Sequence, residues 1–175
     1  MKSGISSILI YGYGNPGRQD DGLGNEFCEK MQEWAEKNNY SFLDFDSNYQ
    51  LNIEDADRIS EKEIVVFADA SVEDIDSFQL TKVNPDHVKI EFTMHAVSPS
   101  FVMKLCQDIY KKTPHIYLLH LKGYKWDFRE GLTARARKNL NAALKVMQGI
   151  LAEEETGIIL QKLESLTETV CCNNH

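Results

Sequence analysis

Short apolar runs alternate along the chain with longer segments in which apolar residues recur every three or four positions. The short runs are typical of buried strands, which we expect at residues 7–11, 41–46, 63–69, 78–83, 88–93 and 116–121. The longer segments predict helices at residues 22–37, after Ser98, after Thr133 and again beyond the acidic run 153–155. Alternating strands and helices indicate an α/β layer architecture. We therefore predict a three-layer α/β/α sandwich, phosphorylase/hydrolase-like, around a mostly parallel, mixed sheet of five strands.

The length of the chain suits one domain with a short extension. Its 175 residues correspond to about one domain of typical size. We place a single α/β domain at residues 1–152 and a C-terminal extension at residues 153–175, which contains a short helix and a frayed tail. Packing against the domain and docking of a partner are both open as roles for this extension.

The charge balance excludes several classes of partner. Lys and Arg number 19 against 27 Asp and Glu, so the formal net charge is −8. A chain with this surplus of acid is unsuited to bind nucleic acid or an anionic membrane surface. No apolar run approaches the roughly 18 residues that span a bilayer, and no signal-peptide core is visible. The four cysteines suit neither a zinc ribbon nor a disulfide scaffold, so we expect a reducing, cytoplasmic location.

A glycine-rich loop follows the first expected strand. Gly12, Gly14 and Gly17 form a G-x-G-x-x-G pattern, which in nucleotide-binding proteins cradles a pyrophosphate at the start of a helix. Here Asp20 and Asp21 precede the helix and would repel the phosphate charge. A nucleotide- or dinucleotide-binding α/β protein therefore remains an alternative, but not the favoured one.

Two carboxylates and one imidazole are expected at the carboxyl ends of the strands, where ligands of α/β proteins gather. Asp21 follows the first strand, Asp69 ends the third, and His95 precedes the helix that starts after Ser98. Such a set suits zinc, nickel or iron and leaves coordination positions open for water or substrate. Taken singly, each residue also has a structural explanation, as a helix cap, a βα-turn acceptor or a turn residue.

These motifs resemble those of the [NiFe]-hydrogenase maturation endopeptidases. The resemblance covers about residues 6 to 150 in order, and its most specific part is the loop G-x-G-N-x-x-x-x-D-D-G-x-G. The other matching segments are the strand 65–70, His95 before Ser98-Pro99, Gly123-Tyr124, and Gly131-Leu132-Thr133.

The resemblance implies an endopeptidase that removes the C-terminal extension of a hydrogenase large-subunit precursor after nickel insertion. It implies Asp21, Asp69 and His95 as the metal-binding and catalytic residues, with Asp20 as an auxiliary group that braces the loop or orients water. The nickel would be carried by the substrate cysteines, and zinc or cadmium could occupy the site in vitro. A non-catalytic chaperone that binds the same precursor is the alternative within this family.

Two further residues are candidates for substrate recognition. Asn15 belongs to the glycine loop, and Asp46 ends the second expected strand. Family members often carry Asp-Gly-Gly-Thr after this strand, in a loop linked to substrate choice, whereas here Asp46 is followed by Ser47 and Asn48. The resemblance therefore does not indicate which hydrogenase would be processed.

Overall fold

The computed structural model describes residues 7–87 and 97–169. The five strands of these ranges are β1 (Ile8–Tyr13), β2 (Leu43–Asn48), β3 (Ile64–Ser71), β4 (Phe78–Lys82) and β5 (His115–Lys122). The α-helices are α1 (Leu23–Lys37), α2 (Asp55–Ser60), α3 (Pro99–Tyr110), α4 (Ala134–Leu151) and α5 (Thr156–Glu168). Two short 3-10 segments are η1 (Pro16–Gly22) and η2 (Pro85–His87). The strand expected at residues 88–93 and the candidate ligand His95 lie outside the described residues.

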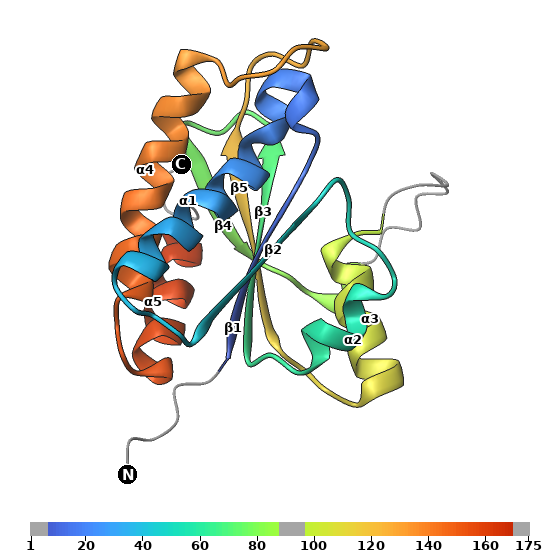
Figure 1. Ribbon diagram of the computed structural model, residues 1–175. Coiled ribbons are helices and arrows are strands. Elements are labelled where there is room, and N and C mark those ends of the chain that lie inside the picture. The colour runs from blue at the N-terminus through green and yellow to red at the C-terminus, as the bar shows by residue number, and fades with distance from the viewer. Residues whose placement is uncertain (1–6, 88–96, 170–175) are drawn as a thin grey trace.

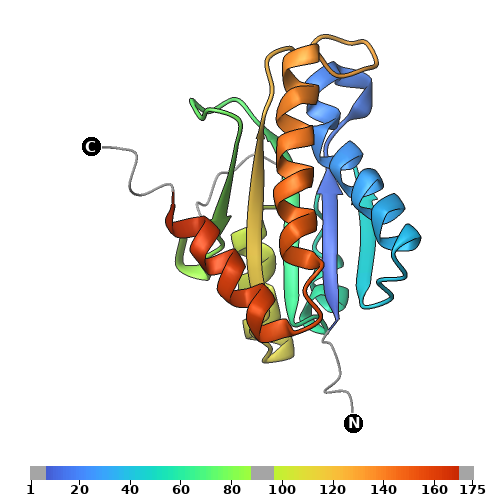
Figure 2. The ribbon, with the colours of Figure 1, turned by 90° about the vertical axis from the view of Figure 1, so that its left-hand side faces the viewer.

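The five strands form one mixed sheet in the order β2-β1-β3-β5-β4. Strands β2, β1, β3 and β5 run parallel to one another, and β4 pairs antiparallel with β5. Helices α1, α4 and α5 cover one face, and α2 and α3 cover the other (Figures 1 and 2). The predicted three-layer α/β/α sandwich with a mostly parallel, mixed sheet is therefore confirmed.

The strands alternate their side chains between two apolar cores, as the period of two along a strand requires. In β1, Ile8 and Ile10 join the core beneath α1, α4 and α5, whereas Leu9 and Tyr11 join the core beneath α2 and α3. All four are essentially inaccessible to solvent. Because both faces of β1 are buried, its sequence is the continuous apolar run that predicted it.

Ser98 and Thr133, after which the sequence predicts helices, are the N-caps of α3 and α4. Ser98 Oγ accepts a hydrogen bond from the backbone N–H of Phe101, and Thr133 Oγ1 accepts one from that of Ala136, each over 3.2 Å. These bonds satisfy backbone donors that a helix start would leave unpaired. The caps fix the residues at which α3 and α4 begin.

Helix α5 lies in the predicted C-terminal extension and packs on the sheet. Ile159 and Leu163 are fully buried in the core that they share with α4 and the strands. Glu164 accepts a hydrogen bond from the Tyr117 hydroxyl at 2.6 Å and pairs with the Lys82 ammonium at 2.7 Å. Packing against the sheet is therefore one role of this part of the extension. Of the helices in the described ranges, none is long and apolar enough to cross a membrane.

Candidate functional site

The glycine loop is shaped by close backbone packing. A Cβ on Gly14 would lie 2.0 Å from the carbonyl oxygen of Asp21, and the φ of +149° at Gly14 is rarely adopted by other residues. A Cβ on Gly24 would lie 2.2 Å from the carbonyl oxygen of Ala68, the residue before Asp69. Glycine at these two positions brings the loop against the ends of both β1 and β3, and so brings Asp21 toward Asp69.

The loop lacks the geometry of a pyrophosphate site. Helix α1 begins only at Leu23, and η1, which contains Gly17, lies between it and Gly12 and Gly14. Asp20 and Asp21 fall within η1, ahead of the N–H groups that would face a phosphate. The arrangement therefore disfavours the nucleotide-binding alternative.

Asp20 holds the loop to a distant segment of the chain. Its side chain is completely buried and accepts hydrogen bonds from the backbone N–H groups of Tyr124, Lys125 and Thr133 at 2.8, 3.1 and 2.7 Å. The Thr133 hydroxyl donates a fourth bond, over 2.9 Å. Both carboxylate oxygens are therefore engaged by protein donors. These bonds brace the loop, which is one of the two auxiliary roles suggested for Asp20.

Asp21 and Asp69 form the acidic pair expected at the strand ends. Asp21 Oδ2 accepts a bond from the backbone N–H of Asn15 at 3.0 Å. Burial raises the pKa of Asp69 to about 7, and the negative charge of Asp21 contributes to this shift. The Tyr13 hydroxyl donates a hydrogen bond to the Asp69 carboxylate and acts in the opposite direction. A partly buried carboxylate beside a second one is the environment in which a bound cation relieves repulsion.

We expect the pKa of Asp69 to lie near 7 in the metal-free protein and to fall in Asp21→Asn, because that variant removes the charge of the neighbour. Since the folded protein holds the proton more tightly than the unfolded chain, stability should decrease as pH rises from about 4 to about 7 and then level off. Titration of the ¹³C carboxyl resonance measures the pKa directly. An ordinary Asp69 pKa near 4, or an Asp69 pKa that is unchanged in Asp21→Asn, would contradict the interaction between the two carboxylates.

Tyr13 and His120 are two residues of this region that the sequence did not mark as site residues. Tyr13 packs edge-on against Phe67 and Tyr11, with ring centroids 6.2 and 6.5 Å apart, which holds its hydroxyl toward Asp69. His120 lies opposite Asp69 in the β3–β5 register, and its Nε2 is 2.9 Å from Thr81 Oγ1. Burial lowers the pKa of His120. In the sequence, the feature that could have marked both as site residues was their position near the carboxyl end of an expected strand.

The other candidate residues have different surroundings. Asn15 caps η1 through its Oδ1, which accepts from the Gly17 N–H at 2.9 Å, while its backbone N–H holds Asp21. Asp46 lies on β2, two strands from β3, and pairs with Arg58 of α2 at 2.6 Å. Within the described residues, no group of three or more His, Cys, Asp or Glu side chains is placed to hold a metal ion. Because His95 is outside those residues, the predicted three-residue set remains a prediction.

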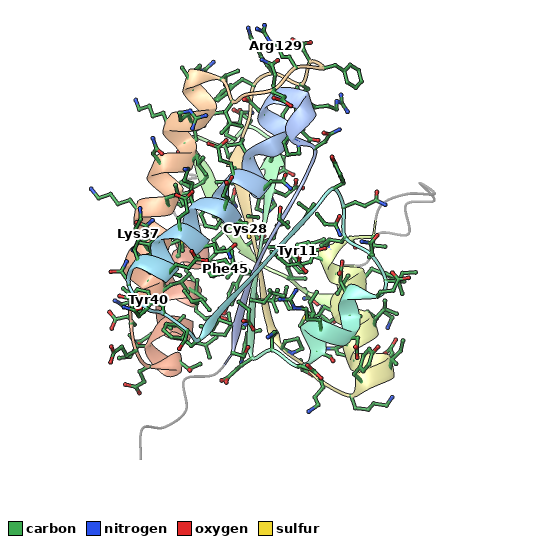
Figure 3. All side chains as sticks on the ribbon, viewed as in Figure 1. Tyr11, Cys28, Lys37, Tyr40, Phe45 and Arg129 are labelled. Atoms are coloured by element: carbon green, nitrogen blue, oxygen red, sulfur yellow. The ribbon has the colours of Figure 1, made fainter. Side chains whose placement is uncertain are left out.

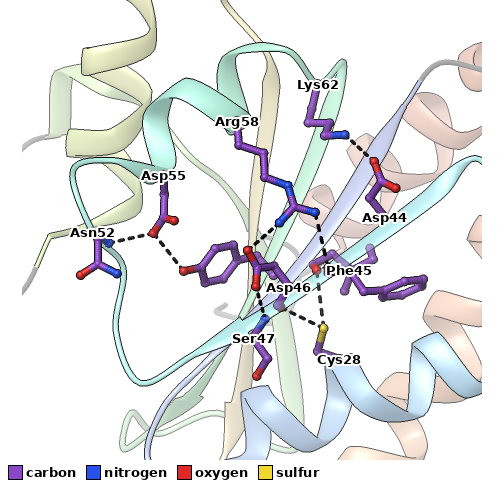
Figure 4. A network of polar contacts seen from close by, with 11 residues as sticks. Cys28, Asp44, Phe45, Asp46, Ser47, Asn52, Asp55, Arg58 and Lys62 are labelled. Carbon is purple, nitrogen blue, oxygen red and sulfur yellow. Dashed lines mark hydrogen bonds and ion pairs between the residues drawn. The ribbon is translucent and has the colours of Figure 1, made fainter.

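Polar contacts fix the edge of the sheet formed by β1 and β2 (Figure 4). The Tyr11 hydroxyl donates to Asp55 at 2.9 Å, and burial together with this carboxylate raises the pKa of Tyr11. Asp44 pairs with Lys62, which lowers the pKa of Asp44. These bonds tie α2 and the residues just after it to β1 and β2.

Comparison with known proteins identifies relatives of the fold. No protein-family model and no curated protein matches the chain. Among solved structures, the [NiFe] hydrogenase maturation protease HycI from Thermococcus kodakarensis KOD1 superimposes with a TM-score of 0.68 and 18% identity, over 86% of this chain and 96% of that one. The hydrogenase maturating endopeptidase HybD from E. coli gives 0.64 and 16%, over 83% and 92% respectively. The chain therefore has the fold of the hydrogenase maturation endopeptidases.

Proposed function

We propose that this protein is a nickel-dependent endopeptidase that removes the C-terminal extension of a [NiFe]-hydrogenase large-subunit precursor after nickel insertion. The observation that carries the proposal is the Asp21–Asp69 pair, with its raised Asp69 pKa, where the glycine loop meets the end of β3. Its fold and the family-like loop motif agree with this role. The precursor is the proposed partner, and the proposal places the protein in the cytoplasm.

In this proposal nickel arrives with the substrate. Asp21 and Asp69 bind it through carboxylate oxygens, and His95 supplies an imidazole nitrogen. A set of three protein ligands leaves room for ligands from the substrate, so the precursor and the protein share the metal. Bound nickel can polarise the scissile carbonyl or activate a water, and the protein needs no serine or cysteine nucleophile. Asp20 holds the loop that carries Asp21 through its bonds to residues 124–133.

A processing assay on nickel-loaded and nickel-free precursor tests the proposal. We expect the loaded precursor to be shortened and released, and the nickel-free precursor to stay intact. The reason is that the proposed ligands Asp21, Asp69 and His95 bind the substrate through its nickel. Mass spectrometry of the large subunit measures the cleavage. Equal cleavage of both forms would rule out nickel dependence, and a stable complex with a precursor of unchanged mass would favour the chaperone alternative.

A further inference from the structure

Three hollows lie in a row along α1. The first, of about 200 Å³, lies between η1, α1 and the segment 130–132. The second, of about 380 Å³, shares Asn25 and Glu29 with the first. The third, of about 670 Å³, shares Gln32 and Phe45 with the second. Because each hollow shares residues with the next, they lie end to end along α1, and we call this row of hollows the furrow.

One polar stripe of α1 forms a wall of the furrow. Its members are Asn25, Glu29, Gln32, Glu36 and Asn39. Spacings of four, three and four residues place the first four on one side of the helix, and Asn39 follows two residues after the end of α1. Fourteen residues separate the two ends, which corresponds to roughly 21 Å along the helix and its C-terminal cap. An extended peptide of about six residues has this length.

The other wall is β2, the edge strand of the sheet (Figure 3). Leu43, Asp44 and Phe45 all line the largest hollow, although successive strand residues point to opposite faces. The hollow therefore reaches around the open edge of β2. The bond from Gly14 N–H to the Asn48 carbonyl turns the even-numbered residues of β2 toward β1, so the backbone groups of the odd-numbered residues face outward. The Phe45 carbonyl accepts a bond from Arg58 at 3.5 Å, and the N–H groups of Leu43 and Ser47 donate to the Tyr40 carbonyl and to Asp46 Oδ1. The Phe45 N–H and the Leu43 and Ser47 carbonyls are the outward groups left to pair with a further strand.

The lining of the furrow has an excess of hydrogen-bond acceptors. Three of its carboxylates are already paired with cations: Glu26 with Arg137, Asp44 with Lys62 and Asp46 with Arg58. The other three, Glu29, Glu36 and Glu130, have no ion pair with the described residues. In the first hollow, Gln19 is 8% exposed and its Oε1 has no hydrogen-bond partner. No three of the described carboxylates are close enough together to hold a metal ion. The lining therefore fits cationic side chains, distributed along a chain, better than it fits a metal.

The near end of the furrow adjoins the candidate active site. Gln19 and Gly22, which flank Asp20 and Asp21 in the sequence, line the first hollow. Asn25 donates from Nδ2 to Ser47 Oγ at 2.9 Å and to the Asn48 carbonyl at 3.1 Å, and thereby joins the start of α1 to the end of β2. A polypeptide along the open edge of β2 is thus led to the loop that carries Asp21.

We propose that the furrow binds an extended, basic segment of the substrate polypeptide, about six residues long, which pairs with the edge of β2. Only the identification of this segment with the substrate rests on the proposed function. Backbone bonds to β2 supply affinity without regard to sequence, as in other cases of strand addition. Glu29 and Glu36, the carboxylates of α1 without an ion pair in the described structure, select lysine and arginine side chains.

Peptide binding tests the furrow without nickel or precursor. The probe is the capped hexapeptide Arg-Val-Arg-Val-Arg-Val, and the matched control is Glu-Val-Glu-Val-Glu-Val. In ¹H–¹⁵N NMR titrations we expect the basic peptide to shift the amides of β2 and the side-chain amides of Asn25 and Gln32, and the acidic peptide to shift none of them. Shifts by both peptides, or shifts scattered over the surface, would overturn the proposal.

Charge variants separate the furrow from general attraction to an acidic protein. The double variant Glu29→Gln with Glu36→Gln should weaken the basic peptide about fivefold. The control double variant Glu33→Gln with Glu168→Gln removes the same charge from residues outside the furrow and should leave the Kd unchanged. Equal weakening by both variants would mean that net charge alone attracts the peptide, and would overturn the proposal.

N-methylated peptides test strand pairing. Methyl groups on alternate backbone nitrogens, in the two possible patterns, should abolish binding in one pattern and spare it in the other, because only one edge of the peptide faces β2. Equal binding of both patterns would overturn strand addition.

A comparison with precursor cleavage distinguishes the two proposals. If the peptide binds but nickel-loaded precursor is never cleaved, the furrow stands and the proposed function fails. If the precursor is cleaved, the peptide does not bind, and the Glu29 and Glu36 variants do not raise KM, the proposed function stands and the furrow fails.

Discussion

Asp20→Ala is expected to lower the free energy of unfolding by about 3 to 5 kcal/mol, a large effect for one residue. The variant removes the only side chain that accepts from the backbone N–H groups of Tyr124, Lys125 and Thr133 in the described structure, and from the Thr133 hydroxyl. Because Asp20 is completely buried, water cannot easily replace the lost acceptor. Urea unfolding at pH 7 measures the loss as a lower midpoint at unchanged m-value.

Asp21→Asn is the control for this prediction. In the described part of the chain, Asp21 accepts one side-chain hydrogen bond, from the Asn15 N–H, and asparagine can still accept it through Oδ1. We expect the stability of Asp21→Asn to stay within about 1 kcal/mol of the wild type. A loss below about 1 kcal/mol for Asp20→Ala would show that the bonds to residues 124–133 do not hold the loop in place.

The contrast between these adjacent aspartates shows what the sequence could not reveal. The pattern placed both residues in one loop and linked both to the site. The donors that bind Asp20 are 104 to 113 positions away along the chain, so no local pattern identifies them. Only the fold shows that Asp20 faces inward while its neighbour lies near Asp69.

The layer architecture was predictable because it depends on local periodicity. The expected strand at residues 63–69 begins one residue before β3 and ends two residues before it does, and the expected helix at 22–37 differs from α1 only at its first residue. Helix α2 was missed because its six residues bury only Ala56, Ile59 and Ser60, which is too few to form a periodic apolar pattern. The position of Tyr13 beside Asp69 depends on the packing of two strands, which periodicity cannot supply.

Asp69→Asn is expected to lower the rate of precursor processing by at least about 100-fold while the protein stays fully folded. The rate falls because an amide oxygen is a much weaker ligand for nickel than a carboxylate. The stability should not fall, because at pH 8 the ionised Asp69 is partly buried beside Asp21, and a neutral amide avoids this cost. The amide oxygen can also accept the hydrogen bond that the Tyr13 hydroxyl donates to Asp69.

The combination of lost activity and retained stability is what separates a functional carboxylate from a structural one. Cleavage of nickel-loaded precursor and urea unfolding should be measured on the same preparations, with the exposed Asp76→Asn as a matched substitution that leaves both unchanged. Since Asp69→Asn carries no titrating group, its stability should also lose the decrease between pH 4 and pH 7 expected for the wild type. Full activity in Asp69→Asn would remove Asp69 from the site. Proteins tolerate an unfavourable buried charge only where function requires it, so lost activity with retained stability would assign Asp69 a functional role. A loss of stability at pH 8 of the size expected for Asp20→Ala would instead assign it a structural role.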